Sequence, residues 1–238
     1  MLDSTPKRVI NIESLAGYYG ETKALHNIKL HVNEGEVVCL LGRNGAGKTT
    51  TLRAVMGLLS HCEGLIEIHG QPTLGLPPES IAHLGVAYCP EERGIFASLS
   101  TEENLLLPPI LKPGGLTVDE IYELFPNLLT RRTSQGTKLS GGEQQMLAIA
   151  RILRTGCKLL LLDECTEGLA PVIVERIGQV ISLLRSRGFT VLMVEQNFRF
   201  ASKYADRFYV IEEGQAIETF HQADIEPNRD RIERLLGL

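Results

Sequence analysis

One glycine-rich segment of this 238-residue sequence has the residue types that hold a chain of phosphates. It runs from Gly42 to Thr49 and matches the pattern G-x-x-x-x-G-K-[ST] in full. Glycines let backbone N–H groups curl around phosphate oxygens, and a helix that starts near Lys48 would add its positive end. The alternative is an ordinary glycine-rich turn, but an apolar strand before it and a helix after it favour the phosphate loop.

Within this loop, we expect Lys48 to reach the β- and γ-phosphates of a purine nucleotide and Thr49 to offer a hydroxyl to Mg²⁺. The residues expected to contact the nucleotide here are Gly42, Arg43, Asn44, Gly45, Ala46, Gly47, Lys48, Thr49 and Thr50. The loop by itself does not distinguish kinases, GTPases, motors and transporters.

Two adjacent carboxylates, Asp163 and Glu164, follow the apolar run Leu159–Leu162. At the carboxyl end of a strand beside the phosphate loop, Asp163 would hold Mg²⁺ directly or through water. Glu164 would point toward an attacking water and suits a general base or a water-positioning group. The pair could instead cap a following helix, but the phosphate loop upstream favours the catalytic interpretation.

A third motif combines a helix cap with two bare glycines. Ser140 and Glu143 form an S-x-x-E capping box that opens a helix predicted over Gln144–Leu153. Gly141 and Gly142 lie between them, and a cap does not require them. They leave the helix N-terminus open to close approach by phosphate, so we expect the four residues Ser140 to Glu143 to contact a nucleotide.

The elements that position these motifs alternate between strand and helix. Nearly continuous apolar runs predict buried strands of a parallel sheet at 36–41, 158–162 and 190–194. Helical patterns follow at 48–57, 172–187 and 198–205. This order predicts a mainly parallel sheet covered by helices on both faces.

Two regions depart from that alternation. Residues 9–12 and 25–32 read as antiparallel strands that precede a turn at 33–35, and Gly214 reads as a later hairpin turn. Between 91 and 139, helical segments that begin at Thr101 and at Val118 are interrupted by proline and glycine. This pattern indicates an inserted helical subdomain.

The predicted fold class is α/β: a P-loop NTPase with a mainly parallel sheet, an N-terminal antiparallel β subdomain and an inserted α-helical subdomain. We expect one nucleotide-binding domain over residues 1–238. Its core would comprise about 1–90 and 156–238, and the helical subdomain that carries Ser140 would comprise about 91–155.

Composition excludes several other classes of protein. A net charge of −5 without a long basic cluster argues against a nucleic-acid partner. Five cysteines without a C-x-x-C pair indicate free thiols in a reducing compartment. The polar N-terminus lacks a signal core, and no stretch approaches the roughly 18 apolar residues that span a bilayer. We therefore expect a cytoplasmic chain that reaches any membrane through a partner.

Taken together and in this order, the three motifs resemble the signature of the ABC transporter ATP-binding subunits. The resemblance implies ATP hydrolysis with Mg²⁺ and a head-to-tail dimer that sandwiches two ATP molecules. Each phosphate loop would be covered by Ser140–Gly142 of the other subunit, which is either an identical or a related chain.

Further positions follow from the same resemblance. Tyr19 corresponds to the residue that stacks on adenine, with Tyr18 as the alternative. Glu91 stands where most members carry a glutamine that contacts Mg²⁺ and the attacking water. Thr166–Ala170 corresponds to the dimer-contact loop, and Gln196 takes the place of the switch histidine.

This sequence departs from the family pattern at three of its positions. Gln196 cannot titrate, although its amide can donate to the γ-phosphate, so base catalysis would shift onto Glu164. Glu91 keeps a carboxylate that can contact Mg²⁺. Cys165 replaces the usual proline, and we expect it to loosen the loop and to expose a thiol at the subunit interface.

The resemblance extends over nearly the whole chain and is strongest to the ATPases of branched-chain amino acid importers with glutamine at the switch. Its matching segments are Tyr122–Pro126, Leu139–Arg151, Thr166–Pro171 and Val194–Gln196. It implies a peripheral subunit on the inner face of the membrane, with two permease subunits and an extracytoplasmic solute-binding protein. Importers of urea or short amides carry similar ATPases and remain open as alternatives.

Two other classes compete with transport. Soluble ABC ATPases of translation or DNA repair resemble the chain less, because they carry two ATPase units or a long coiled coil. A non-catalytic regulator conflicts with intact Lys48, Asp163 and Glu164. Exposed apolar side chains on the helical subdomain would favour transport, although they could instead form its core. The candidates are Ile95, Phe96, Leu105, Leu106, Leu107 and Phe125.

Overall fold

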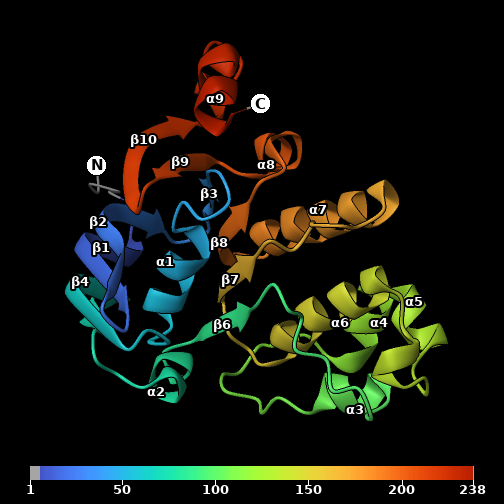
Figure 1. Cartoon of the computed structure of the whole chain (residues 1–238). Helices are drawn as coiled ribbons and strands as arrows, with labels where there is room; N and C mark the ends of the chain where they lie inside the picture. Colours follow the sequence, from blue (N-terminus) through green and yellow to red (C-terminus); the bar gives the residue numbers. More distant parts are fainter. Residues whose placement is uncertain (1–5, 238) are drawn as a thin grey trace, which may run out of the picture.

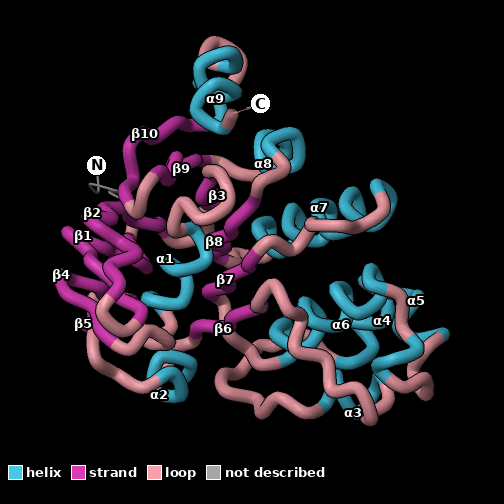
Figure 2. Tube along the Cα trace, viewed as in Figure 1, coloured by secondary structure: helices cyan, strands magenta, loops and turns pink. Residues whose placement is uncertain are grey.

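The computed structural model describes residues 6–237. Its strands are β1 (Arg8–Tyr19), β2 (Thr22–Asn33), β3 (Val37–Leu41), β4 (His61–Ile68), β5 (Gln71–Pro72), β6 (Val86–Cys89), β7 (Leu159–Asp163), β8 (Thr190–Glu195), β9 (Arg207–Glu212) and β10 (Gln215–His221). They form one ten-stranded sheet in the order β5-β4-β1-β2-β10-β9-β3-β8-β7-β6 (Figures 1 and 2).

The helices gather on either side of this sheet (Figure 1). They are α1 (Lys48–Val55), α2 (Pro78–His83), α3 (Thr101–Leu106), α4 (Val118–Leu124), α5 (Pro126–Thr130), α6 (Gly141–Arg154), α7 (Pro171–Ser186), α8 (Phe198–Tyr204) and α9 (Arg229–Leu236). Short 3₁₀ turns cover Gly136–Lys138 and Gln222–Asp224.

The parallel part of the sheet is buried on both faces. Strands β6, β7, β8, β3 and β9 pair in parallel with their neighbours. On β3, Cys39 faces the core that includes residues of α6, α7 and α8, and Leu40 faces the core formed with β1, β2 and α1. Alternate side chains therefore enter two separate cores, which explains the unbroken apolar run and confirms the predicted fold class.

The antiparallel part is larger than the sequence predicted. Strand β1 pairs with both β2 and β4, and β5 extends that edge. Strands β9 and β10 form the hairpin expected at Gly214, and a single parallel pairing, Gln215 with Asn27, joins β10 to β2. The predictions omitted β4 because its charged residues and Gly64 obscure the strand pattern.

The helical segment α3–α6 lies beyond the β6 edge of the sheet (Figure 1). Capping boxes open α3 at Ser100, α4 at Thr117 and α6 at Ser140. Helix α5 was not predicted. It begins at Pro126, and proline fits the first position of a helix. Among the described residues, no helix is long and apolar enough to cross a membrane.

The apolar candidates on this helical segment divide into two groups. Leu105 and Phe125 are fully buried and belong to the core, which was the alternative left open for these candidates, and Ile95 is partly buried against the same core. Phe96, Leu106 and Leu107 are exposed by 52%, 46% and 49%, and Ile110 adds a further exposed apolar side chain. Exposed apolar side chains are therefore present on this segment, and Leu129 of α5 is a further one.

Close packing between α7 and α8 yields a stability prediction. A Cβ added at Gly178 would lie 2.1 Å from the ring of Tyr204, which is only 8% exposed. Alanine normally stabilises a helix interior relative to glycine by about 1 kcal/mol, but overpacking costs about 1–3 kcal/mol. We expect Gly178→Ala to lower the urea midpoint, whereas exposed Gln179→Ala changes the free energy of unfolding by less than about 0.5 kcal/mol. A stabilised Gly178→Ala protein would contradict this packing.

Candidate active site

The phosphate loop connects β3 to α1 along a path that only glycine permits. A Cβ on Gly42, whose φ is 156°, would lie 2.3 Å from the carbonyl oxygen of Ile211. Gly47 is the N-cap of α1 with a φ of 107°, and no side chain caps this helix end. The first N–H groups of α1 therefore remain available to an anion.

Lys48 is only 3% exposed, and its ammonium group is surrounded by oxygen atoms. Its Nζ donates to the carbonyl oxygens of Gly42 at 2.8 Å and Arg43 at 3.0 Å, and it lies 3.6 Å from Glu164 Oε1. A buried cation is stable only with such partners. The predicted phosphate ligand and the predicted base are thus neighbours.

Asp163, the last residue of β7, is fully buried and receives two side-chain hydrogen bonds. Thr49 Oγ1 donates to Oδ1 at 2.8 Å, and the Tyr88 hydroxyl donates to Oδ2 at 2.9 Å. Burial raises the pKa of Asp163, and both hydrogen bonds oppose that shift. The hydroxyl of Thr49 and the carboxylate of Asp163 are hard oxygen donors of the kind that Mg²⁺ prefers.

Glu164 has a left-handed backbone conformation with a φ of 44°, which costs of order 1 kcal/mol for a residue with a side chain. Gln196 Nε2 donates to its Oε2 at 2.7 Å. The Gln196 amide, which was expected to face the γ-phosphate, is thus bonded to Glu164, the expected base. This hydrogen bond fixes the Glu164 carboxylate, whose other oxygen faces Lys48.

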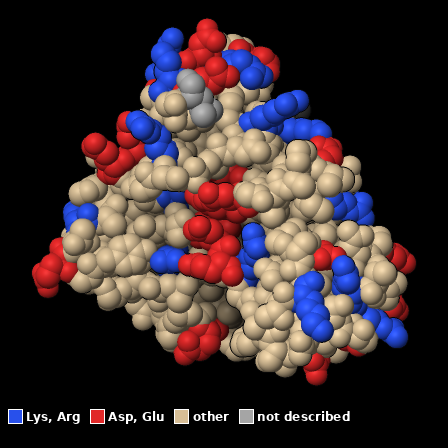
Figure 3. Space-filling view, turned by 45° about the vertical axis from the view of Figure 1, so that its right-hand side comes forward, with Lys and Arg blue, Asp and Glu red and all other residues tan. Residues whose placement is uncertain are grey.

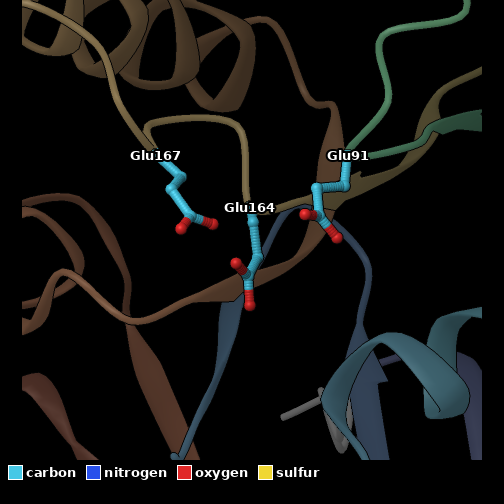
Figure 4. Close-up of side chains that lie close together, drawn as sticks. All are labelled: Glu91, Glu164 and Glu167. Carbon is cyan, nitrogen blue, oxygen red and sulfur yellow. The ribbon is translucent and has the colours of Figure 1, made fainter. Parts of the chain in front are cut away.

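Three carboxylates converge at this point (Figure 4). One oxygen atom each from Glu91, Glu164 and Glu167 lies within 4.8 Å of the others. A hydrogen bond with Glu164, followed by burial, raises the pKa of Glu167 to about 7. Figure 3 shows acidic side chains gathered in the middle of one face of the molecule, with basic side chains beside them. The geometry is suited to a cation or a shared proton.

A further carboxyl group lies beneath this cluster. Glu195, at the end of β8, is 1% exposed and accepts hydrogen bonds from Thr166 Oγ1 at 2.7 Å and Cys165 Sγ at 3.4 Å. Burial raises the pKa of Glu195 to about 7 and holds the pKa of the Cys165 thiol well above its usual range. Cys165 is fully buried, so the expectation of an accessible thiol was wrong: the side chain points inward to the carboxyl group.

The two adjacent tyrosines have different surroundings. The Tyr18 ring packs against His61 in a tilted arrangement with ring centroids 5.1 Å apart, and its hydroxyl donates to Glu63 at 3.5 Å. Tyr19 is 43% exposed and lies beside Arg53 of α1, where its hydroxyl raises the pKa of that guanidinium. Only Tyr19 combines a free ring with a position near the helix that follows the phosphate loop.

The predicted capping box at α6 forms in both directions. Ser140 N donates to Glu143 Oε2 at 2.8 Å, and Glu143 N donates to Ser140 Oγ at 3.3 Å. Arg131 Nε lies 3.4 Å from Glu143 Oε1. Gly141 is exposed at the first turn, so the helix end is open as the two glycines suggested.

Sequence reasoning did not identify Tyr88 and Glu195 as site residues, and it assigned Glu167 only to the dimer-contact loop Thr166–Ala170. No local pattern marks Tyr88, whose role depends on the pairing of β6 with β7. Glu167 and Glu195 lie next to predicted site residues, and a charged residue at the end of an apolar strand was the available signal for Glu195.

Comparison with known proteins gives a consistent result. The ABC transporter family model matches residues 25–167. The high-affinity branched-chain amino acid transport ATP-binding protein BraG of Pseudomonas aeruginosa is 42% identical, across 88% of this chain and 91% of the relative. The lipopolysaccharide export system ATP-binding protein LptB of Haemophilus influenzae is 38% identical, across 89% and 90%.

Two solved structures share the fold. A nucleotide-free ATP-binding cassette from an ABC transporter superposes with a TM-score of 0.80 at 25% identity, covering 97% of this chain and 96% of that one. A dimeric bacterial ABC transporter cassette superposes with a TM-score of 0.77 at 26% identity, covering 90% and 98%.

Glu195 yields a pH prediction. Because its pKa rises from 4.5 in the unfolded chain to about 7 in the folded chain, its stabilising contribution is complete below pH 4.5 and is lost as pH rises through 7. Glu195→Gln mimics the protonated acid, so we expect it to be more stable than the natural chain by up to ~3 kcal/mol at pH 8 and nearly equal at pH 4.5. Urea unfolding at both pH values measures the free energies of unfolding. If the two proteins differed by the same amount at pH 4.5 and pH 8, the raised pKa of Glu195 would be contradicted.

Proposed function

The chain belongs to the ABC transporter family and is an ATP-hydrolysing enzyme, and we propose that it powers the import of branched-chain amino acids. The observation that carries the catalytic part is the meeting of Lys48, Asp163 and Glu164 at the carboxyl ends of the parallel strands. ATP-binding core and helical signature subdomain would divide near residues 90 and 155, as the sequence suggested.

The catalytic roles follow from the contacts of each side chain. Glu164 is the general base: it is held by Gln196, and its backbone is strained into a fixed position. Lys48 and the N–H groups of the loop bind the β- and γ-phosphates. Thr49 and Asp163 would hold Mg²⁺ with Glu91 beside them, and the ion would neutralise charge on the phosphates. Tyr19 would stack on adenine.

We propose that the active enzyme is a head-to-tail dimer. Ser140, Gly141, Gly142 and Glu143 would contact the γ-phosphate of ATP held by the other subunit. The open N-terminus of α6 supports this assignment, as does the dimeric state of a cassette with the same fold.

The proposed solute follows from relatedness. BraG, at 42% identity, serves branched-chain amino acid transport, and the segment Val194–Gln196 fits that group. Permease subunits would dock on the exposed side chains of Phe96, Leu106, Leu107 and Ile110, with a solute-binding protein outside the membrane. LptB, at 38% identity, makes lipopolysaccharide export the second candidate, and import of urea or short amides is the third.

Glu164→Gln tests the catalytic assignment. Loss of a general base lowers turnover by about 10²–10⁴-fold, whereas the neutral isostere keeps the shape of the site. We expect ATP binding and ATP-driven dimerisation to persist while phosphate release falls by at least about 100-fold. The matched control is Glu175→Gln on the exposed side of α7, which should hydrolyse ATP at the natural rate. Natural turnover in Glu164→Gln would refute the assignment.

The solute is tested in proteoliposomes that contain the chain, its permease subunits and its binding protein. We expect ATP inside the vesicles to drive uptake of radiolabelled leucine, and Glu164→Gln to abolish uptake while the complex still assembles. Labelled urea is the parallel substrate. Uptake of urea without leucine would reject the branched-chain assignment, and ATP-driven movement of lipopolysaccharide would favour the export function.

A further inference from the structure

Arg93 lies against the open end of α6. Its guanidinium approaches Gly141 so closely that a Cβ on that glycine would lie 3.2 Å from Nη1. Nε donates to Gln145 Oε1 at 3.2 Å and Nη1 donates to Gln144 Oε1 at 3.3 Å. The side chain thus reaches the first turn of the signature helix from the segment that follows β6.

This position is electrostatically unfavourable in the isolated chain. The N-terminus of a helix carries partial positive charge, so a cation there is unfavourable. Within residues 6–237, no carboxylate forms an ion pair with Arg93, and Nη2 has no hydrogen-bond acceptor. Because the Arg93 side chain is only partly buried, an arriving anion could reach both positive groups.

The backbone of Arg93 adds a second cost. Its φ is 61°, in the left-handed region, and strain of this kind persists where the surroundings hold it. Arg151 on α6 supplies that support, because its Nη2 donates to the Arg93 carbonyl and its Nη1 donates to the Gly94 carbonyl, both at 2.8 Å. The segment is therefore fixed to the signature helix, and the guanidinium moves with it.

Arg131 provides a contrast at the same helix end. It pairs with Glu143 at 3.4 Å, so its charge is already compensated within the chain. Arg93 has only the neutral side-chain oxygens of Gln144 and Gln145. Of its five N–H donors, the three without a partner in the described chain can bind phosphate oxygens.

We propose that Arg93 binds the phosphates of the ATP held by the second subunit, alongside the signature residues. The inference rests on the proposed head-to-tail dimer. Arg93 would then complete a nucleotide site in the partner rather than in its own chain. Its guanidinium would form charge-assisted hydrogen bonds to phosphate oxygens, and ATP would relieve the unfavourable charge at α6.

The test measures dimerisation and nucleotide binding separately, in the non-hydrolysing Glu164→Gln background. Sedimentation with saturating Mg-ATP gives the dimer Kd for chains with Arg93, Arg93→Gln or Arg93→Lys. A fluorescent ATP analogue, titrated at protein concentrations below association, gives the affinity of the monomer. Arg187→Gln at the end of α7, whose side chain pairs with exposed Glu120, is the charge-matched control.

We expect Arg93→Gln to raise the dimer Kd at least tenfold while monomer affinity changes less than twofold. Arg93→Lys keeps the charge but loses the planar set of N–H donors, so its dimer Kd should lie between those of the parent and Arg93→Gln. The control should match the parent in both measurements.

Four outcomes would overturn the inference. Equal weakening by lysine and glutamine would assign Arg93 to packing, and a comparable loss of monomer affinity would assign it to its own site. An unchanged dimer Kd in Arg93→Gln would show that Arg93 does not contact the phosphates, and the proposed function would stand. If the parent chain itself fails to dimerise with ATP, the head-to-tail pairing and the inference fall together.

Discussion

The parallel pairing of β3, β8 and β7 is the constraint on which the site depends. Leu41 pairs with Glu195, and Asp163 pairs with Val194, so three strands end at the same level. The phosphate loop, the Asp163–Glu164 pair and Gln196 leave the sheet there, although more than 100 residues separate the first from the others. A one-residue slip would turn each terminal side chain to the opposite face.

Charge balance then determines how the converging groups behave. Lys48 is nearly buried among carbonyl oxygens and faces Glu164, while Glu91 and Glu167 add negative charge nearby. The hydrogen bond with Glu164, followed by burial, raises the pKa of Glu167, so this carboxyl group can hold a proton near neutral pH and reduce the repulsion. A nucleotide brings further negative charge, which makes bound Mg²⁺ and a protonated carboxyl group useful at the same place. The charges of the site are therefore balanced for a bound nucleotide and its Mg²⁺ ion.

The sequence predicted those parts of the site that local spacing encodes. The phosphate loop, the capping box at Ser140 and the apolar strands before Asp163 and Gln196 are short-range patterns, and the structure places them at the expected elements. Tyr88 was missed because its contact with Asp163 depends on the pairing of neighbouring strands. Strand β4 and helix α5 were missed because polar residues, glycine and proline weaken the pattern in elements that tertiary packing stabilises.

Cys165, which stands where the family usually has proline, bonds to the buried carboxyl group of Glu195. Proline at this position would offer no side-chain donor, whereas the Cys165 thiol donates to Glu195 beside the hydroxyl of Thr166. The loop after Glu164 is thus tied to the end of β8, and the residue that follows this strand is Gln196, which holds the base. Because both connections end on adjacent residues, a shift of β8 would move the dimer-contact loop and the base together, so the two proposed functions of this loop are mechanically linked.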